Sequence, residues 1–209
     1  VGEKGRAILI DQSKERLDAA RKFAEGAKNI TFTQSSLEKI DLKDGTADYV
    51  FCRFVFEYLK SPEVVLKELV RIAKPGGKIV VGDLDHNMLS HYPMSEKLNE
   101  QMREIFQNLQ SMKTLDPYAG RKIYSWFRSA GIQNIKVHLI PHHLIYGELE
   151  TRDLDNWTAK LDQMEKMVAE GSLKLSFDIK KFRLEFMEFF KSPARFSYSP
   201  LILVEGFKA

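Results

Sequence analysis

Residues 68–81 read Glu-Leu-Val-Arg-Ile-Ala-Lys-Pro-Gly-Gly-Lys-Ile-Val-Val, and this stretch decides the fold. It begins inside an amphipathic helix that starts near Ser61, where Ser61-Pro62-Glu63 is typical of an N-cap, a proline at the first helical position and an acidic first turn. Lys74-Pro75-Gly76-Gly77 stops that helix, because neither proline nor a glycine pair continues it well. The apolar run over residues 78–84 then predicts a buried strand. A helix, a tight stop and a buried strand in this order indicate an α/β sheet.

The same alternation extends toward the N-terminus. Short apolar runs predict strands over residues 7–10, 30–33 and 47–52, and a helix that Ser13 can cap lies between the first two. Strands and helices that alternate in this way predict a doubly wound, Rossmann-like, mostly parallel sheet covered by helices on both faces.

The second half of the chain has a different pattern. Apolar residues repeat every three or four positions over residues 95–113, 123–130, 154–168 and 179–190, which predicts four amphipathic helices. Two more strands are expected over residues 135–146, broken or bulged at Pro141, and over residues 199–207. We expect the aromatic and methionine stripes of these helices to be core, because buried packing is their usual role.

Composition excludes several classes of protein. The 209 residues are 44% hydrophobic and 29% charged, as in ordinary globular proteins, and the formal net charge of +3 is too small to indicate a nucleic-acid partner. The single cysteine, Cys52, excludes an internal disulfide framework and a cysteine-rich zinc site. No apolar run reaches the roughly 20 residues that span a bilayer, and residues 1–6 lack the apolar segment of a signal peptide, so we expect a cytoplasmic protein without a membrane span.

Ligands of open parallel sheets bind at the carboxyl ends of the strands, so the residues that follow each apolar run are the candidates for a site. These residues are Asp11-Gln12, residues 34–37, Arg53-Phe54 and residues 83–87. An acidic residue at the end of a strand, such as Asp11, is suited to accept hydrogen bonds from both hydroxyls of a ribose. The alternative is that Asp11 only caps the helix that follows it.

Three segments together resemble one family. They are AILIDQSKERLDAAR over residues 7–21, ADYVFCRFVFEYL over residues 47–59 and ELVRIAKPGG over residues 68–77. In order and spacing they are similar to the class I S-adenosylmethionine-dependent methyltransferases, most of all to the small-molecule enzymes of the quinone-biosynthesis type, over residues 1 to about 85. The resemblance implies S-adenosylmethionine as cofactor, a small-molecule methyl acceptor and an antiparallel last strand.

The resemblance also implies roles for six cofactor-binding residues: Asp11 at the ribose hydroxyls, Gln12 beside the adenine, Ser36 at the adenine amino group, the Leu37 backbone N–H facing the adenine, and Arg53 and Phe54 near the methionine end. Ser36 departs from the family, which often has an aspartate there. A serine hydroxyl still accepts a hydrogen bond, although more weakly than a carboxylate.

A second departure is larger. The family's glycine-rich loop, together with the first strand before it and the first helix after it, would precede Val1 and is absent from this chain. That unit of about 30 residues is missing, supplied by another chain or never present, and we favour the first. The expected organisation is a single, N-terminally incomplete methyltransferase domain over residues 1–209, with helical insertions at residues 88–118 and 150–195 that roof the cofactor cleft.

Candidate catalytic residues follow the strand over residues 78–84. Asp85, His86 and Tyr92, with His91 nearby, could orient or deprotonate an acceptor hydroxyl or amine; the alternative is that they only form turns or lie on the surface. Glu57 is a further candidate for lining the pocket. His142 and His143 could be mistaken for a metal pair, but neighbours on a strand point to opposite faces, so we expect no metal site.

The predicted function is methyl transfer to a small molecule by in-line displacement. The alternative is a non-catalytic methyltransferase-like binding module, which the absent glycine loop and Ser36 favour. A nicotinamide-dependent dehydrogenase on a similar sheet has less support, because it does not explain the Pro-Gly-Gly turn or the last strand. The sequence leaves open the methyl acceptor, the atom that is methylated and the oligomeric state.

Overall fold

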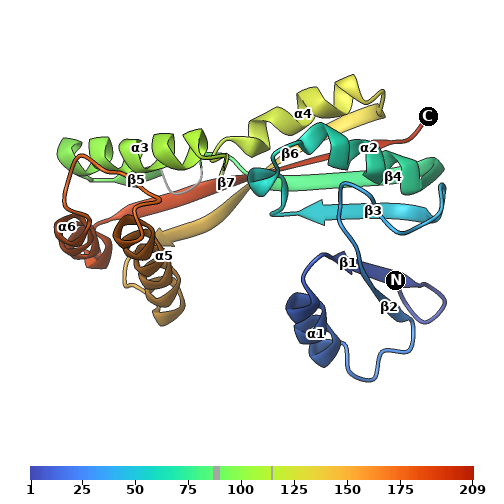
Figure 1. Ribbon diagram of the computed structural model, residues 1–209, viewed down its shortest axis with the longest axis horizontal. Coiled ribbons are helices and arrows are strands. Elements are labelled where there is room, and N and C mark those ends of the chain that lie inside the picture. The colour runs from blue at the N-terminus through green and yellow to red at the C-terminus, as the bar shows by residue number, and fades with distance from the viewer. Residues whose placement is uncertain (87–89, 114) are drawn as a thin grey trace.

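The computed structural model describes residues 1–86, 90–113 and 115–209 (Figure 1). Its strands are β1 (Ala7–Asp11), β2 (Ile30–Gln34), β3 (Ala47–Arg53), β4 (Ala73–Leu84), β5 (Ser90–Tyr92), β6 (Gln133–Tyr146) and β7 (Phe196–Phe207). Its helices are α1 (Lys14–Phe23), the short 3-10 helix η1 (Phe56–Tyr58), α2 (Pro62–Ile72), α3 (Glu96–Ser111), α4 (Ala119–Ser129), α5 (Thr151–Ala169) and α6 (Ile179–Lys191). None of the helices described is long and apolar enough to cross a membrane.

The strands form two sheets. β1 and β2 pair in parallel as a two-stranded sheet, and the other sheet has the order β3-β4-β7-β5, with β6 also paired to β7. β3 and β4 are parallel, whereas β7 runs antiparallel to β4, β5 and β6. The predicted α/β class and the antiparallel last strand are therefore confirmed. Figure 1 shows β1, α1 and β2 as a unit beside β3, and no pairing joins β1 to β3 within the described residues.

The larger sheet carries its helices on one face. α2 and α4 lie on the same side of β3, β4 and β7 (Figure 1), and Val50 and Cys52 of β3 are buried beneath them. Tyr49 and Phe51 alternate with those residues and are 55% and 53% exposed. The expected cover on both faces is thus not found for the described part of the chain, because α1 packs on β1 and β2 instead.

The Pro-Gly-Gly segment stops α2 as predicted, at Ile72, but it also begins β4. The Gly76 N–H donates to the carbonyl of Lys208 at 3.0 Å, and the Lys208 N–H donates to the carbonyl of Gly77 at 3.0 Å. Gly76 has φ +71°, and a Cβ on Gly77 would lie 2.8 Å from the carbonyl oxygen of Lys74. The strand starts five residues earlier than expected because this turn pairs with the C-terminal end of the chain.

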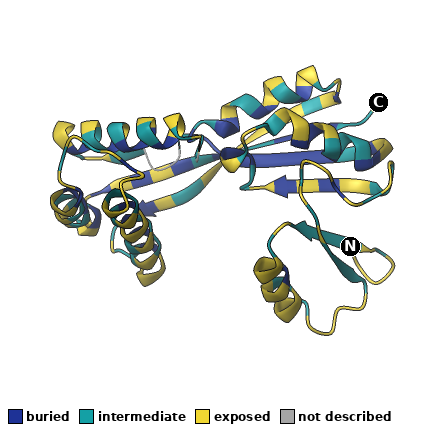
Figure 2. Ribbon diagram, viewed as in Figure 1, coloured by how far each residue is buried: buried dark blue, intermediate teal, exposed yellow. Residues whose placement is uncertain are grey.

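A second buried cluster lies mainly among α3, α5 and α6. Figure 2 shows buried residues both along β4 and on the inner faces of these helices. Trp157, Phe182, Phe186 and Phe190 are all buried and stack on one another with ring centroids 4.8–5.7 Å apart. The prediction that the aromatic stripes are core is confirmed. The apolar pattern does not predict β5, which extends the sheet beside β7.

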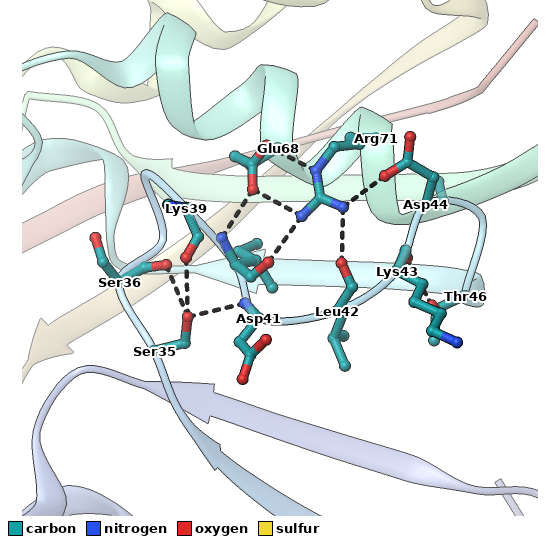
Figure 3. A network of polar contacts seen from close by, with 12 residues as sticks. Ser35, Ser36, Lys39, Asp41, Leu42, Lys43, Asp44, Thr46, Glu68 and Arg71 are labelled. Carbon is teal, nitrogen blue, oxygen red and sulfur yellow. Dashed lines mark hydrogen bonds and ion pairs between the residues drawn. The ribbon is translucent and has the colours of Figure 1, made fainter.

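One arginine ties the connection between β2 and β3 to α2 (Figure 3). The Arg71 guanidinium donates to the carbonyls of Ile40 and Leu42 at 2.8 and 2.7 Å, and it forms ion pairs with Glu68 and Asp44, both at 2.8 Å. Glu68 in turn accepts the backbone N–H of Ile40 at 2.8 Å. This network fixes the segment that follows the predicted adenine-binding residues.

Candidate functional site

The carboxyl ends of β1 and β2 lie side by side. Asp11 is in register with Gln34, and the Ser35 N–H donates to the Asp11 carbonyl at 3.1 Å. The Asp11 carboxylate accepts the Ser13 N–H at 2.8 Å and lies 3.8 Å from the Arg16 guanidinium. Asp11 therefore helps to start α1, but its side chain keeps 30% of its surface exposed. A carboxylate in this position can still accept hydrogen bonds from a ligand.

The other predicted adenine-side residues lie at the same end of this sheet. The Gln12 carbonyl accepts from the Gln34 side chain at 3.1 Å, and the Ser36 hydroxyl accepts the Glu38 N–H at 3.2 Å. Leu37 packs against the main core. The Asp11 carboxylate can accept hydrogen bonds from both hydroxyls of a ribose, and the Ser36 hydroxyl can form a further hydrogen bond. Together these two groups suit a nucleoside.

The end of β3 meets β6. Phe54 follows β3 with φ +58°, a backbone conformation that a non-glycine residue adopts rarely. The Arg53 guanidinium lies over the Phe54 ring, 4.6 Å from its centroid, and the same ring lies 5.2 Å from that of His142. Arg53 and Phe54 thus lie together at the strand end, as expected, with an imidazole from another strand beside them.

The end of β4 carries two buried carboxylates with different partners. Asp83 is fully buried and accepts the N–H groups of Val55, Glu57 and Leu84 at 3.1, 3.0 and 2.8 Å. Burial raises its pKa, and these backbone hydrogen bonds oppose the shift. Asp83 therefore shapes the loop that leads from β3 into η1.

Asp85 forms a bidentate ion pair with Arg121 at the start of α4. The two N–O distances are 2.7 and 2.9 Å, and the Arg121 backbone N–H adds a third hydrogen bond at 3.2 Å. Asp85 therefore accepts three hydrogen bonds from Arg121, and these hydrogen bonds hold the start of α4 in place.

His86 lies next to Asp85 and is half-buried. Its Nδ1 is 2.9 Å from the Ser90 hydroxyl, and its ring stacks on that of Tyr118 at 5.7 Å. Burial and the charge of Arg121 lower the pKa of His86, while Asp85 opposes the shift, so the imidazole is neutral and can accept a proton. Asn87, which closes this candidate segment, lies outside the described residues.

The structure does not bring Tyr92 to Asp85. Leu84 pairs with Leu201 of β7, whereas Tyr92 pairs with Phe196, five residues earlier on that strand and hence about 17 Å away. Tyr92 is 74% exposed. Its neighbour His91 contacts the Ser197 hydroxyl at 2.8 Å and packs edge-on against Trp157 inside the second core.

The expectation that His142 and His143 point to opposite faces is wrong. Their rings lie 4.1 Å apart, because the pairing of β6 with β7 shifts register between His142 and Ile145 and His143 has φ +47°. This bulge turns both imidazoles to one side. Within the described residues, no group of three or more histidine, cysteine, aspartate or glutamate residues could hold a metal ion.

Lys160 of α5 is a charged residue that the sequence pattern does not single out. Its ammonium lies 5.0 Å from the centroid of the Trp157 ring, and its charge acts on His142, His143 and Glu57. Glu57 is 4% exposed. We call Phe54, Glu57, His142, His143 and Lys160 the β3-end cluster. The sequence signal for Lys160 is weak: one lysine three residues after Trp157, at the border of an apolar stripe.

Electrostatics distinguish the members of this cluster. Burial lowers the pKa of Lys160, and the nearby Glu57 carboxylate opposes the shift. Burial also lowers the pKa of His142, with further lowering by Arg53 and Lys160. The pKa of His143 falls to about 4, mainly through burial and then through His142 and Lys160. Both imidazoles are therefore neutral near pH 7.

A cavity of about 390 Å³ opens beside η1. Its walls include Phe56, Leu59 and Trp126 as apolar surface, with Lys60 and Lys122 at charged positions. Glu57 also lines it, so this cavity and the β3-end cluster share one side chain. Near the end of β3, a reactive side chain and open space therefore lie together at Glu57.

Comparison with known proteins gives one family match. Residues 2–81 match the family described as "Methyltransferase domain". This range includes the predicted cofactor residues at the ends of β1, β2 and β3, and it ends within β4.

Curated relatives match over part of their length. A demethylmenaquinone methyltransferase of Shouchella clausii is 38% identical over 82 residues, which are 38% of this chain and 35% of that protein. The chain spans 31%, 58% and 35% of the length of the first three curated relatives.

Solved structures match over nearly the whole chain. A Bacillus halodurans protein assigned as a methyltransferase has a TM-score of 0.61 at 15% identity, covering 97% of this chain and 83% of that one. Phosphoethanolamine N-methyltransferase 2 of Haemonchus contortus, solved with phosphomonomethylethanolamine and S-adenosylhomocysteine, has a TM-score of 0.54 at 14% identity, covering 98% and 49%. At these identities the likeness shows the fold.

Proposed function

We propose that this chain transfers a methyl group from S-adenosylmethionine to a small molecule. The premise is that it is a class I S-adenosylmethionine-dependent methyltransferase, by its fold and by the family match of residues 2–81. The observation that carries the proposal is the convergence of Asp11 and Ser36 at one end of the β1–β2 sheet, inside the matched range. That end presents the groups that a nucleoside needs.

In this proposal the cofactor's nucleoside lies on β1 and β2. Asp11 accepts from the ribose hydroxyls, Gln12 packs by the adenine, and Ser36 and the Leu37 N–H contact its edge. Arg53 and Phe54, at the end of β3, hold the methionine end, where the guanidinium suits a carboxylate. When bound, S-adenosylmethionine supplies an electrophilic methyl group on a sulfonium.

The acceptor side lies at the ends of β3 and β4. Asp85 fixes α4 through Arg121, and the neutral His86 beside it can take a proton from an acceptor hydroxyl or amine. Tyr92 is not part of this acceptor side, because β5 places it away from Asp85. A small-molecule acceptor is supported by the name of the Shouchella relative and by the small amine bound in the Haemonchus structure.

The protein as it exists tests this proposal by calorimetric titration with S-adenosylmethionine. We expect saturable binding that Asp11→Ala weakens at least about tenfold, a loss of about 1.4 kcal/mol. Asp18→Ala is the matched control, because Asp18 is an exposed aspartate of α1 paired with Arg21. Absence of binding by the unaltered chain contradicts the proposal.

Turnover separates the enzyme from the binding module. The chain is incubated with S-adenosylmethionine and, in turn, phenol, amine and quinol acceptors, and S-adenosylhomocysteine is measured by mass spectrometry. Its formation with one class of acceptor supports the enzyme. Cofactor binding without turnover in any class supports the non-catalytic alternative.

A further inference from the structure

We propose that one face of the larger sheet, at the end that contains β5, is the contact surface of a homodimer, in which a second copy of this chain packs its identical face against it. Four exposed aromatic residues form this surface, which we call the aromatic patch: Tyr92, Tyr146, Phe196 and Tyr198. Figure 1 shows β5 and the adjoining parts of β6 and β7 at the end of the molecule away from the β1–β2 sheet. The proposal does not depend on methyl transfer, and it gives a role to Tyr92, which the acceptor side does not use.

Strand pairing brings the four side chains of the aromatic patch together. Tyr92 of β5 and Tyr146 of β6 lie directly opposite Phe196 of β7, one on each side of it. Directly opposite residues of antiparallel strands project from the same face, with Cβ atoms about 5 Å apart. Tyr198 comes two residues after Phe196, hence on the same face, and the two rings are 5.7 Å apart. Aromatic rings from three strands therefore form one continuous surface.

The two faces of this part of the sheet differ in cover. His91, Ile145 and Ser197 alternate with the patch residues and project from the other face, where Ile145 is 6% and Ser197 2% exposed. Ile145 belongs to the second buried cluster. The four residues of the aromatic patch are 43–74% exposed, and none of them packs in either buried cluster of the described residues. The described part of the chain therefore covers one face here and leaves the aromatic face open.

The size of the aromatic patch suits the centre of a dimer interface. Its exposed fractions correspond to roughly 450 Å² of aromatic side-chain surface on each copy. A specific interface of standard size covers about 800 Å² on each partner. The patch supplies about half of that area, and the exposed neighbours Leu144 and Pro93 extend it. Charged residues are depleted and aromatic residues enriched at the centre of such interfaces, as they are in this patch.

The lack of charge makes a second copy the fitting partner. Residues 90–92, 144–146 and 196–198 include no aspartate, glutamate, lysine or arginine. A twofold axis brings the same surface of both copies together, and a surface without charges does not repel its own copy. Tyrosine hydroxyls both donate and accept hydrogen bonds, and aromatic rings pack edge to face with one another. The aromatic patch thus contains the groups that complement it.

Two other occupants fit less well. Lysine and arginine accompany the aromatic residues of proteins that bind a membrane surface. The first charged residue after Tyr92 is Glu96 instead. The first after Tyr146 is Glu148, and both glutamates are exposed. A partner that added a strand to the outer edge of β6 would meet Pro141, which has no N–H to donate, and the register shift that follows it.

Sedimentation velocity of the whole chain between about 1 and 100 μM tests the inference. We expect a reversible monomer–dimer equilibrium. Tyr146→Lys puts an unpaired charge on each contacting face and should raise the dissociation constant at least about tenfold. Phe23→Lys is the matched control, because Phe23 is a 95% exposed aromatic residue of α1 outside the patch, and it should change the constant less than about twofold. Circular dichroism shows that each variant folds.

A thiol-specific crosslink locates the contact. Cys52 is the only cysteine of the sequence and is buried, so Tyr92→Cys adds a single exposed thiol. A short bismaleimide should join two copies of Tyr92→Cys and leave Phe23→Cys monomeric. A chain that stays monomeric over the whole concentration range, or a dimer that Tyr146→Lys does not weaken, overturns the inference. A monomeric chain that co-sediments with phosphatidylglycerol vesicles overturns it in favour of a membrane surface.

Discussion

The Asp83 carboxylate accepts the backbone N–H of Glu57 at 3.0 Å, so the end of β4 fixes the place of a side chain on η1. The same carboxylate also accepts the N–H groups of Val55 and Leu84. Glu57 is the member of the β3-end cluster closest in sequence to these contacts. The position of Glu57 relative to β4 therefore depends on one buried carboxylate.

Asp83→Asn should destabilise the protein by about 1–3 kcal/mol, because the amide nitrogen cannot accept and leaves a buried N–H without its partner. The free energy of unfolding in urea measures this effect. Asp41→Asn, a change at an exposed aspartate of the β2–β3 connection, is the control and should stay within about 0.5 kcal/mol. An unchanged urea midpoint for Asp83→Asn would show that these hydrogen bonds contribute little.

Arg121→Gln should cost about 1–3 kcal/mol, because it leaves the Asp85 carboxylate, which is 8% exposed, without its bidentate partner. Arg103→Gln removes an exposed ion pair with Glu96 and should change the free energy of unfolding by less than about 0.5 kcal/mol. The double variant Asp85→Asn/Arg121→Gln should be more stable than the sum of the single losses predicts. Additive losses would contradict the coupling.

The elements of this fold follow from local patterns in the sequence. Ser13 and Ser95 accept the N–H groups of Arg16 and Leu98 and begin α1 and α3 as expected, and Gly131 takes the positive φ that ends α4. These features depend on a few neighbouring residues, so the pattern is sufficient to find them. β5 has three residues and depends on its pairing with β7, which a periodicity analysis does not detect.

The candidate site was predictable at the strand ends and not beyond them. Asp11 and Phe54 lie where the end of a strand places them, whatever the rest of the chain does. His143 could not be placed, because the register shift in β6 depends on the pairing with β7. Lys160 reaches the cluster from α5, about 100 residues after Phe54, and only the tertiary packing of that helix brings the two together.

Arg71→Lys should destabilise the β2–β3 connection by about 1–3 kcal/mol. Lysine keeps the charge, but its ammonium cannot donate hydrogen bonds to Ile40, Leu42 and Glu68 at the same time. Limited proteolysis should then cut within residues 39–46 faster, and the free energy of unfolding should fall. Arg21→Lys, at the exposed pair with Asp18, is the control. Equal cleavage rates for the two variants would contradict the role of the network.

The stability of the chain should fall in mildly acidic solution through His143. Its pKa is about 4 in the folded protein against 6.5 for a free histidine, mainly because of burial and then because of His142 and Lys160; Arg152 adds to the shift, while Asp153 opposes it. Between these two pH values the unfolded state binds more protons than the folded state. The contribution is therefore complete above pH 6.5 and is lost as the pH falls toward 4.

His143→Gln should flatten this part of the profile, since glutamine does not titrate. Because His143 is only partly buried, we expect the loss between pH 6.5 and 4 to be smaller in the variant by on the order of 1–2 kcal/mol. Urea unfolding at several pH values measures it. His138→Gln is the matched control, because His138 lies on the same strand with an exposed side chain near Glu205. Parallel pH profiles for His143→Gln and the unaltered protein would show that His143 is not held neutral by the fold.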